Sequence, residues 1–224
     1  MFLRTDMRAA LLYEKLRDLC KELRKGQTNK DVLSGIMASL FARSVCLSDS
    51  FHELPIVDAL CSKYGANYCQ YCGKHPCRCE KDRTNDISYI TISNRQRIWS
   101  VTDWTSHLHE LYGKNNTERG IDHALLRLSE EMHEVQATYI FEKALDNNFT
   151  LSMRREALAR EFADVFAWIF SITGMLDLDL QSAIEHRYGA KCRECNQKPC
   201  NCPSPILRNR NNPVGEKANS TVAT

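Results

Sequence analysis

The chain has 224 residues, of which 43% are hydrophobic and 26% are charged. This length and composition suit one medium domain or two small ones and are typical of a globular protein. The 30 Lys and Arg residues against 28 Asp and Glu residues give a formal net charge of +2. This balance excludes a globally basic nucleic-acid coat and an acidic, disordered protein.

The chain shows no sign of a membrane or secretory segment. No run of roughly 18 uninterrupted apolar residues occurs, so we expect no membrane-spanning helix. The first residues, Met1 to Asp6, lack the long apolar stretch of a secretory leader. We therefore expect a cytoplasmic protein. In a reducing compartment the clusters among its 11 cysteines more often bind metal than form disulfides.

Apolar residues recur at spacings of three and four along most of the chain, which predicts amphipathic helices and an all-α fold. The predicted helices span 11–23, 32–45, 98–113, 121–140, 158–174 and about 178–187. Gly113 and Gly174 are expected to end the third and fifth of these helices.

A cysteine-rich motif occurs twice, about 124 residues apart. Both copies read Tyr-Gly-Ala and then Cys-x2-Cys-x3-Pro-Cys-x-Cys, with one extra residue in the first copy. Such self-similarity indicates two homologous units. The predicted division is a repeat over 1–79, a polar linker over 80–95, a repeat over 96–202 and a disordered tail over 203–224.

Each copy of the motif supplies four thiols in a spacing that fits a tetrahedral zinc site. The predicted ligands are Cys69, Cys72, Cys77 and Cys79 in the first knuckle and Cys192, Cys195, Cys200 and Cys202 in the second. We expect structural Zn²⁺, because four thiolates leave no open position for catalysis. Disulfides, an iron–sulfur cluster and ligands shared between the copies are the alternatives. Basic flanks would also suit nucleic acid, although a solvated surface is favoured.

Carboxylates lie within or beside the apolar stripes of two predicted helices. Glu131 lies three residues after Leu128, and Glu134 lies three residues further on. Glu161 and Asp164 have the same spacing on the next predicted helix. Residues three or four apart share a helix face. Buried carboxylates are costly and repel one another, and Mg²⁺ removes both penalties, so the pattern predicts Mg²⁺ shared with substrate phosphates.

A solvent-exposed acidic face is the alternative for these helices. It would carry helical ion pairs such as Arg127–Glu131 and Arg160–Asp164. Two acidic motifs on neighbouring helices favour the metal site over this alternative.

The order and spacing of the acids resemble those of the MazG-like, all-α nucleoside triphosphate pyrophosphohydrolases. The resemblance rests on Glu130-Glu131-x-x-Glu134, a gap of 26 residues, and Glu161-x-x-Asp164. Further similarities are Ala163-Asp164-Val165-Phe166, Leu178-Asp179-Leu180 and the helix with Trp99 and Trp104. Together they cover roughly 96–190.

The resemblance implies a four-helix arrangement, usually completed by dimerisation, with Mg²⁺ between the acidic motifs. It implies a hydrolase that cleaves nucleotides between the α- and β-phosphates, giving a monophosphate and pyrophosphate, by in-line attack of a metal-bound water. Carried over, the Mg²⁺ ligands would be Glu131, Glu134, Glu161 and Asp164. Glu130 would ligate the metal or orient the attacking water.

The first predicted repeat departs from this pattern. Aligning the two Tyr-Gly-Ala motifs places Met37 opposite Glu161. The same alignment places Leu40 opposite Asp164. We therefore expect a MazG-like helical bundle of two pseudo-symmetric repeats, one catalytic and one degenerate, the latter supplying packing and cleft-wall residues. Further assembly into a homo-oligomer stays open.

A non-enzymatic module is the rival hypothesis. In it the fold senses a nucleotide, or the zinc knuckles hold a protein or a nucleic acid. The acidic motif favours the enzyme, whereas the degenerate repeat and the basic knuckles favour the rival. A measurement of pyrophosphate release from nucleotides separates the two.

Overall fold

The computed structural model describes residues 2–26, 29–51, 53–79, 99–145, 150–189, 191 and 196–197. Within these residues every regular element is a helix, which confirms the all-α prediction. Met1–Arg187 form one compact unit and Tyr188–Thr224 a second. The predicted linker, the four cysteines of the second knuckle and the predicted tail lie outside the described residues.

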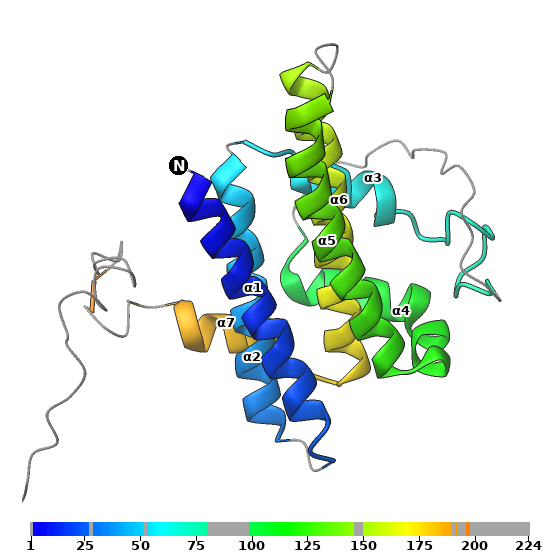
Figure 1. The fold of residues 1–224 in the computed structure, drawn as a ribbon. Helices are drawn as coiled ribbons and strands as arrows, with labels where there is room; N and C mark the ends of the chain where they lie inside the picture. Colours follow the sequence, from blue (N-terminus) through cyan, green and yellow to red (C-terminus); the bar gives the residue numbers. More distant parts are fainter. Residues whose placement is uncertain are drawn as a thin grey trace, which may run out of the picture. The chain divides into compact units, whose positions relative to one another are not determined.

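The described part of the chain contains seven α-helices and one short 3-10 helix. They are α1 (Phe2–Leu23), α2 (Lys30–Ser48), η1 (Asp49–Phe51), α3 (Ile56–Tyr64), α4 (Val101–Arg119), α5 (Ile121–Leu145), α6 (Leu151–Met175) and α7 (Leu180–Tyr188). Two helical hairpins, α1–α2 and α5–α6, dominate the unit, and α3 and α4 pack against α6 (Figure 1). Helix α6 is thus the central element, in contact with α2, α3, α4 and α5.

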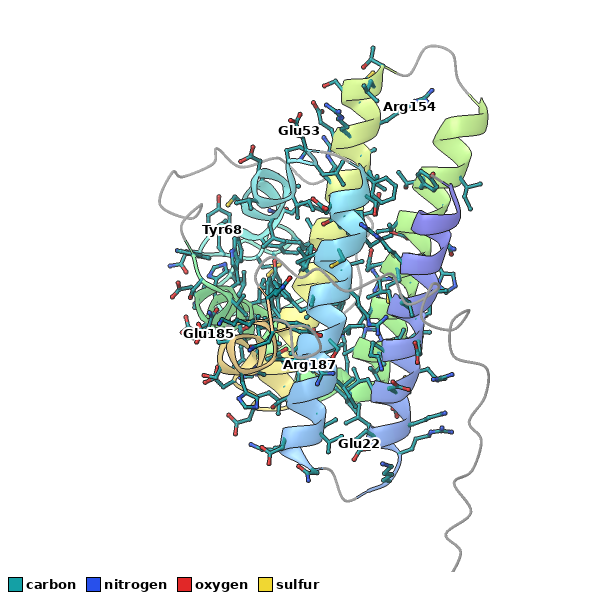
Figure 2. The ribbon with its side chains drawn as sticks, turned by 90° about the vertical axis from the view of Figure 1, so that its left-hand side faces the viewer. Glu22, Glu53, Tyr68, Arg154, Glu185 and Arg187 are labelled. Atoms are coloured by element: carbon teal, nitrogen blue, oxygen red, sulfur yellow. The ribbon has the colours of Figure 1, made fainter. Side chains whose placement is uncertain are left out.

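One hydrophobic core joins the segments that the sequence divides into two repeats. Leu19 on α1 and Leu40 on α2 belong to the same buried cluster as Leu128 on α5 and Phe162 on α6. Side chains fill the space between the helices from the end marked by Glu22 toward the opposite end marked by Arg154 (Figure 2). The first predicted repeat therefore supports the helices that carry the acids. The pseudo-symmetric arrangement itself stays a prediction.

The end of α4 differs from the prediction. The helix continues through Gly113 to Arg119 and is followed by Gly120 with φ +87°. Inside α4, Gly113 makes room for a side chain of its own helix, because a Cβ there would lie 2.8 Å from His109 Nδ1. Gly113 is therefore a position without room for a side chain, and Gly120 at the helix end has a positive φ that glycine adopts readily because it lacks a Cβ.

Helix α3 was not predicted, and it has a counterpart in α7. Both helices have nine residues, and they end at Tyr64 and Tyr188, the tyrosines that open the two cysteine motifs. In the first predicted repeat, Met37 and Leu40 are fully buried on α2. The positions of α2 that align with the acids of α6 are therefore filled by hydrophobic core residues.

Lys30–Phe51 has the length and hydropathy of a membrane-spanning helix. In the structure, 44% of its most apolar window is buried. Leu33 and Met37 from this segment lie in the core cluster together with residues of α6. Core helices of soluble proteins share these features, so the absence of a membrane-spanning helix stays a prediction.

Replacing Phe162 by Ala should lower the free energy of unfolding by about 3–5 kcal/mol, because it removes a large side chain and leaves a cavity. Phe162 is fully buried on α6, and its ring centroid lies 5.9 Å from that of Phe51. Chemical denaturation measures the change. Leu126→Ala on α5, a residue that is 66% exposed, is the control and should change stability by less than about 0.5 kcal/mol. Equal effects of the two variants would contradict the described core.

Candidate active site

Three carboxylates from α5 and α6 converge in the structure. One oxygen from each of Glu131, Glu161 and Asp164 lies within 4.8 Å of the others. Glu131 and Asp164 are buried, and Glu161 is half-buried. Because α5 and α6 pack side by side, residues spaced by three on α6 meet a residue from the facing turn of α5. The predicted convergence of these three side chains is therefore found.

The other two acids of the predicted motif lie differently. Glu134 lines the same cavity as Glu131 and Asp164, one helical turn beyond Glu131. Glu130 is exposed and forms an ion pair with Arg127, outside the three-carboxylate group. Glu134 thus extends the site toward solvent, whereas Glu130 faces along the surface of α5.

The electrostatics of the cluster oppose ionisation of its members. Burial, and then the charge of Asp164, raise the pKa of Glu131 to about 8. The same two causes raise the pKa of Glu161 to about 7. Burial also raises the pKa of Asp164, although the charge of Lys63 opposes the shift. A divalent cation among the three carboxylates would favour their ionised forms.

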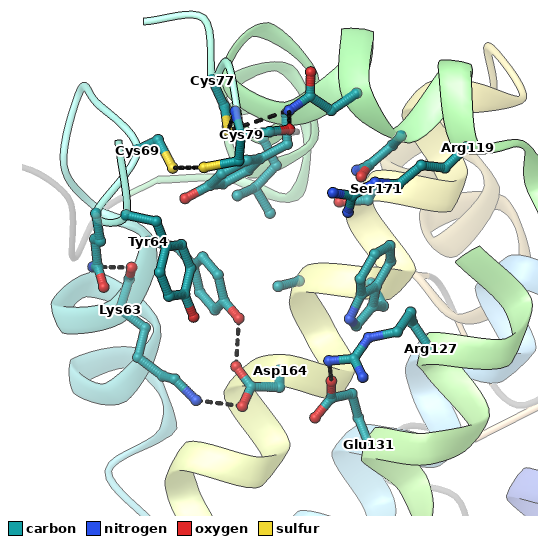
Figure 3. A pocket seen from close by; sticks show the side chains of 18 of the residues that line it. Lys63, Tyr64, Cys69, Cys77, Cys79, Arg119, Arg127, Glu131, Asp164 and Ser171 are labelled. Carbon is teal, nitrogen blue, oxygen red and sulfur yellow. Dashed lines mark hydrogen bonds and ion pairs between the residues drawn. The ribbon is translucent and has the colours of Figure 1, made fainter. Parts of the chain in front are cut away.

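Two residues of the first predicted repeat reach the acids. Lys63 Nζ forms an ion pair with Asp164 Oδ2, and the Tyr64 hydroxyl donates a hydrogen bond to Asp164 Oδ1 (Figure 3). On the other side, Arg127 Nη2 donates to Glu131 Oε1 at 2.9 Å. The Arg127–Glu131 ion pair, which the alternative of a solvent-exposed acidic face required, is therefore present, but it lies within the buried cluster. Lys63 and Tyr64 were missed, and their one signal was their place at the start of the repeated motif.

The C-terminal end of α3 is held from two directions. Gln70 Nε2 donates to the carbonyl oxygens of Ser62, at 3.1 Å, and Lys63. His107 Nε2 lies 2.7 Å from the carbonyl oxygen of Tyr64 and donates to it. Burial lowers the pKa of His107, although the hydrogen bond to Tyr64 opposes the shift. The cysteine knuckle and α4 thus fix the backbone that presents Lys63 and Tyr64 to the acids.

The first cysteine knuckle has the geometry of a four-thiolate metal site. The Sγ atoms of Cys69, Cys72, Cys77 and Cys79 all lie within 4.8 Å of one another. The Cys69–Cys79 separation is 3.8 Å and the Cys72–Cys77 separation is 4.0 Å. A disulfide requires about 2.05 Å, whereas Zn–S bonds of about 2.3 Å in a tetrahedron place the sulfurs about 3.8 Å apart. The four thiols are free and can bind a metal such as zinc.

Hydrogen bonds attach the knuckle to α4, and others are directed at its sulfur atoms. The Cys77 backbone N–H donates to the Leu111 carbonyl oxygen at 2.8 Å. Asn115 Nδ2 lies 3.4 Å from Cys77 Sγ and 3.1 Å from the Cys79 carbonyl oxygen. The Arg78 backbone N–H approaches Cys72 Sγ at 3.4 Å. N–H groups directed at sulfur support thiolates around a metal.

A cavity of about 300 Å³ lies between the carboxylates and the knuckle (Figure 3). Its wall combines acids, the bases Lys63, Arg119 and Arg127, and aromatic rings such as Tyr112 and Trp168. Carboxylates can hold a cation, and Lys and Arg side chains suit phosphate. The arrangement can therefore accept a polyanion together with divalent cations.

The raised pKa values predict how metal-free protein responds to pH. The folded-state pKa values of Glu131 and Glu161 lie above their ordinary value of 4.5, so the folded state binds more protons than the unfolded state. Stability should therefore fall as the pH rises from about 5 to about 8, and Mg²⁺ should restore it at the upper end. Thermal unfolding in EDTA and in Mg²⁺ measures both effects. Glu161→Gln should flatten the pH dependence, and a melting temperature that rises with pH over this range would contradict the expectation.

Comparisons with protein-family models, with curated proteins and with solved structures find no match to this chain. The described residues bring together Glu131, Glu161 and Asp164, and they also bring together the first cysteine knuckle. The second knuckle is outside the described residues. Any assignment of activity therefore rests on the chemistry of the cavity.

Proposed function

We propose that the chain is a Mg²⁺-dependent, MazG-like nucleotide pyrophosphohydrolase that converts nucleoside triphosphates to monophosphates and pyrophosphate. The convergence of Glu131, Glu161 and Asp164 at a cavity that also presents Arg119 and Arg127 carries this proposal. Carboxyl groups with raised pKa values in a mixed polar and aromatic cavity are typical of active sites.

The donor set fits Mg²⁺. All three converging groups are carboxylates, and Mg²⁺ prefers oxygen ligands and is commonly shared with substrate phosphates. Glu131, Glu161 and Asp164 would hold the ions, with Glu134 as the neighbouring carboxylate. When bound, Mg²⁺ neutralises phosphate charge and makes a water molecule more acidic.

The basic side chains act on the phosphates in this proposal. Arg127 is now paired with Glu131, and Lys63 is paired with Asp164. When these carboxylates turn to a cation, both bases become available to phosphate oxygens, where Arg119 also lines the wall. The charge of the site then remains balanced while the substrate binds.

The reaction forms one bond and breaks one. A water oxygen attacks the α-phosphorus, and the bond from that phosphorus to the oxygen bridging the β-phosphorus breaks, so pyrophosphate leaves with the bonding electrons. The water proton passes to a carboxylate. We assign this role to Glu134, which lines the cavity and forms no ion pair with a basic side chain among the described residues.

In this proposal the two predicted repeats have different tasks. The second supplies the acids, and the first supplies Lys63 and Tyr64 together with a knuckle that would hold structural Zn²⁺. A cytoplasmic location would keep the thiols reduced for this purpose.

Incubation of the full chain with ribo- and deoxyribonucleoside triphosphates in Mg²⁺ tests the proposal. We expect pyrophosphate and monophosphate in equal amounts from at least one nucleotide, and no release in EDTA. Absence of pyrophosphate with every nucleotide, or release of single phosphates instead, would overturn it.

The rival, a non-enzymatic nucleotide sensor, has one observation in its favour. Asp164 is paired with Lys63 and Tyr64, and Glu131 is paired with Arg127, so these charges are compensated within the chain. Nucleotide binding without turnover in the same incubation would support the sensor.

A further inference from the structure

Two buried polar side chains in the cavity have no partner within the described chain. Asn116 on α4 and Ser171 on α6 each have 7% exposure, and both line the cavity. Among the described residues, neither side chain has a hydrogen-bond partner. Neither side chain has a polar atom that is both completely shielded from solvent and unpaired, so the polar ends of both are open to the cavity. Two unpaired polar ends that are open to the same cavity are available to a ligand, which would supply their hydrogen-bond partners.

The two groups lie away from the carboxylates. Asp164, Trp168 and Ser171 share one face of α6, and the rise of the helix places Ser171 about 10 Å beyond Asp164. Asn116 lies one turn before Arg119, which Figure 3 shows beside Ser171 and away from Lys63. The cavity thus has acids at one end, Asn116 and Ser171 at the other, and an aromatic ring between them.

The chemistry of the far end suits a nucleobase. A carboxamide offers two donors and an acceptor, and a hydroxyl offers both functions, so together they match the adjacent donors and acceptors on the polar edge of a base. Trp168 is half-buried at the cavity wall and lies edge-on to His123, with ring centroids 6.4 Å apart. An indole in this position provides a surface on which a base stacks.

We infer that Asn116 and Ser171 form a nucleobase-recognition subsite, with Trp168 as its stacking surface. The inference rests on the proposed function for the presence of a nucleotide, and it adds the residues that set base preference. The inference commits to the base of the nucleotide, and not its ribose, as the group that these side chains bind.

Asn116→Leu removes the polar atoms at similar volume. Because the Asn116 side chain pairs with nothing in the described chain, this variant should unfold at the wild-type temperature or above it. Asn115→Leu is the matched contrast, because Asn115 donates to Cys77 and Cys79 and its replacement should lower the unfolding temperature. Ser171→Ala is a second, smaller change at the same subsite.

Calorimetric binding of non-hydrolysable α,β-methylene nucleoside triphosphates with four different bases, in Mg²⁺, tests the subsite. Inorganic tripolyphosphate is the probe that lacks a base. We expect Asn116→Leu to weaken the preferred nucleotide about tenfold or more, to flatten base preference and to leave tripolyphosphate binding unchanged. Ser171→Ala should have the same pattern with a smaller loss.

The inference is overturned if Asn116→Leu keeps the wild-type base preference or loses as much affinity for tripolyphosphate as for the nucleotides. It is also overturned if no analogue binds to the wild type, or if the lost affinity depends on ribose against deoxyribose and not on the base. Since the analogues are not hydrolysed, the outcome is separate from turnover. If base preference depends on Asn116 but the wild type releases no pyrophosphate, the subsite is retained and the hydrolase is refuted. If the wild type releases pyrophosphate but Asn116→Leu keeps the same base preference, the hydrolase is retained and the subsite is refuted.

Discussion

Replacing Glu161 by Gln should lower the rate of pyrophosphate release at least about 100-fold while the chain stays folded. The amide keeps the shape of the side chain and removes one of three converging negative charges. Because burial disfavours the charged form of Glu161, the neutral variant should unfold at the wild-type temperature or above it in the absence of metal. Steady-state pyrophosphate assays and thermal unfolding measure the two effects.

Glu156→Gln is the matched control for this experiment. Glu156 is exposed on the same helix, α6, and accepts a hydrogen bond from Ser152, away from the cavity. Its replacement should leave pyrophosphate release unchanged. Equal rates for Glu161→Gln and the wild type would show that the carboxylate cluster is not the site of hydrolysis.

Replacing Cys77 by Ser should remove one zinc ion from an expected two per chain and lower the stability by at least about 2 kcal/mol, or roughly 4–8 °C in melting temperature. Cys77 is buried, belongs to the four-thiol group and accepts a hydrogen bond from Asn115. Loss of the metal also frees Gln70, which holds the end of α3, so we expect pyrophosphate release to fall as well. Metal analysis, thermal unfolding and the activity assay measure these changes.

Cys46→Ser controls for the loss of a thiol as such. Cys46 is exposed on α2 and lies outside the four-thiol group. Its replacement should keep zinc content and melting temperature at the wild-type values. Unchanged zinc in Cys77→Ser, or less than one zinc per chain in the wild type, would contradict the predicted pair of zinc sites.

Local sequence patterns predicted every α-helix except α3, and they predicted the acids. Apolar spacing of three and four depends on one helix at a time, so it identified α5 and α6 and placed Glu131, Glu161 and Asp164 on their inner faces. Cysteine spacing likewise predicted the cluster of thiols in the first knuckle. Each of these predictions depends on neighbours within a helical turn or a short loop.

Features that depend on distant contacts could not be predicted. Lys63 lies 101 residues before Asp164, and nothing in its local sequence indicates that it pairs with an acid. Gly113 has the sequence signature of a helix end, yet it lies inside α4, where the His109 side chain passes between Gly113 and Gly174 of α6 and leaves no room for a Cβ at either position. Asn116 and Ser171 carry no signal in the sequence, and only the structure shows that both side chains line the same cavity. Tertiary packing decides all four positions.

The most direct test is a crystal of the wild-type chain with Mn²⁺ and a non-hydrolysable nucleoside triphosphate, examined for anomalous scattering from the metal. We expect a manganese peak in contact with Glu131, Glu161 and Asp164, with nucleotide phosphates beside it. Nucleotide bound elsewhere, with no metal among these carboxylates and Lys63 still paired with Asp164, would contradict the central claim.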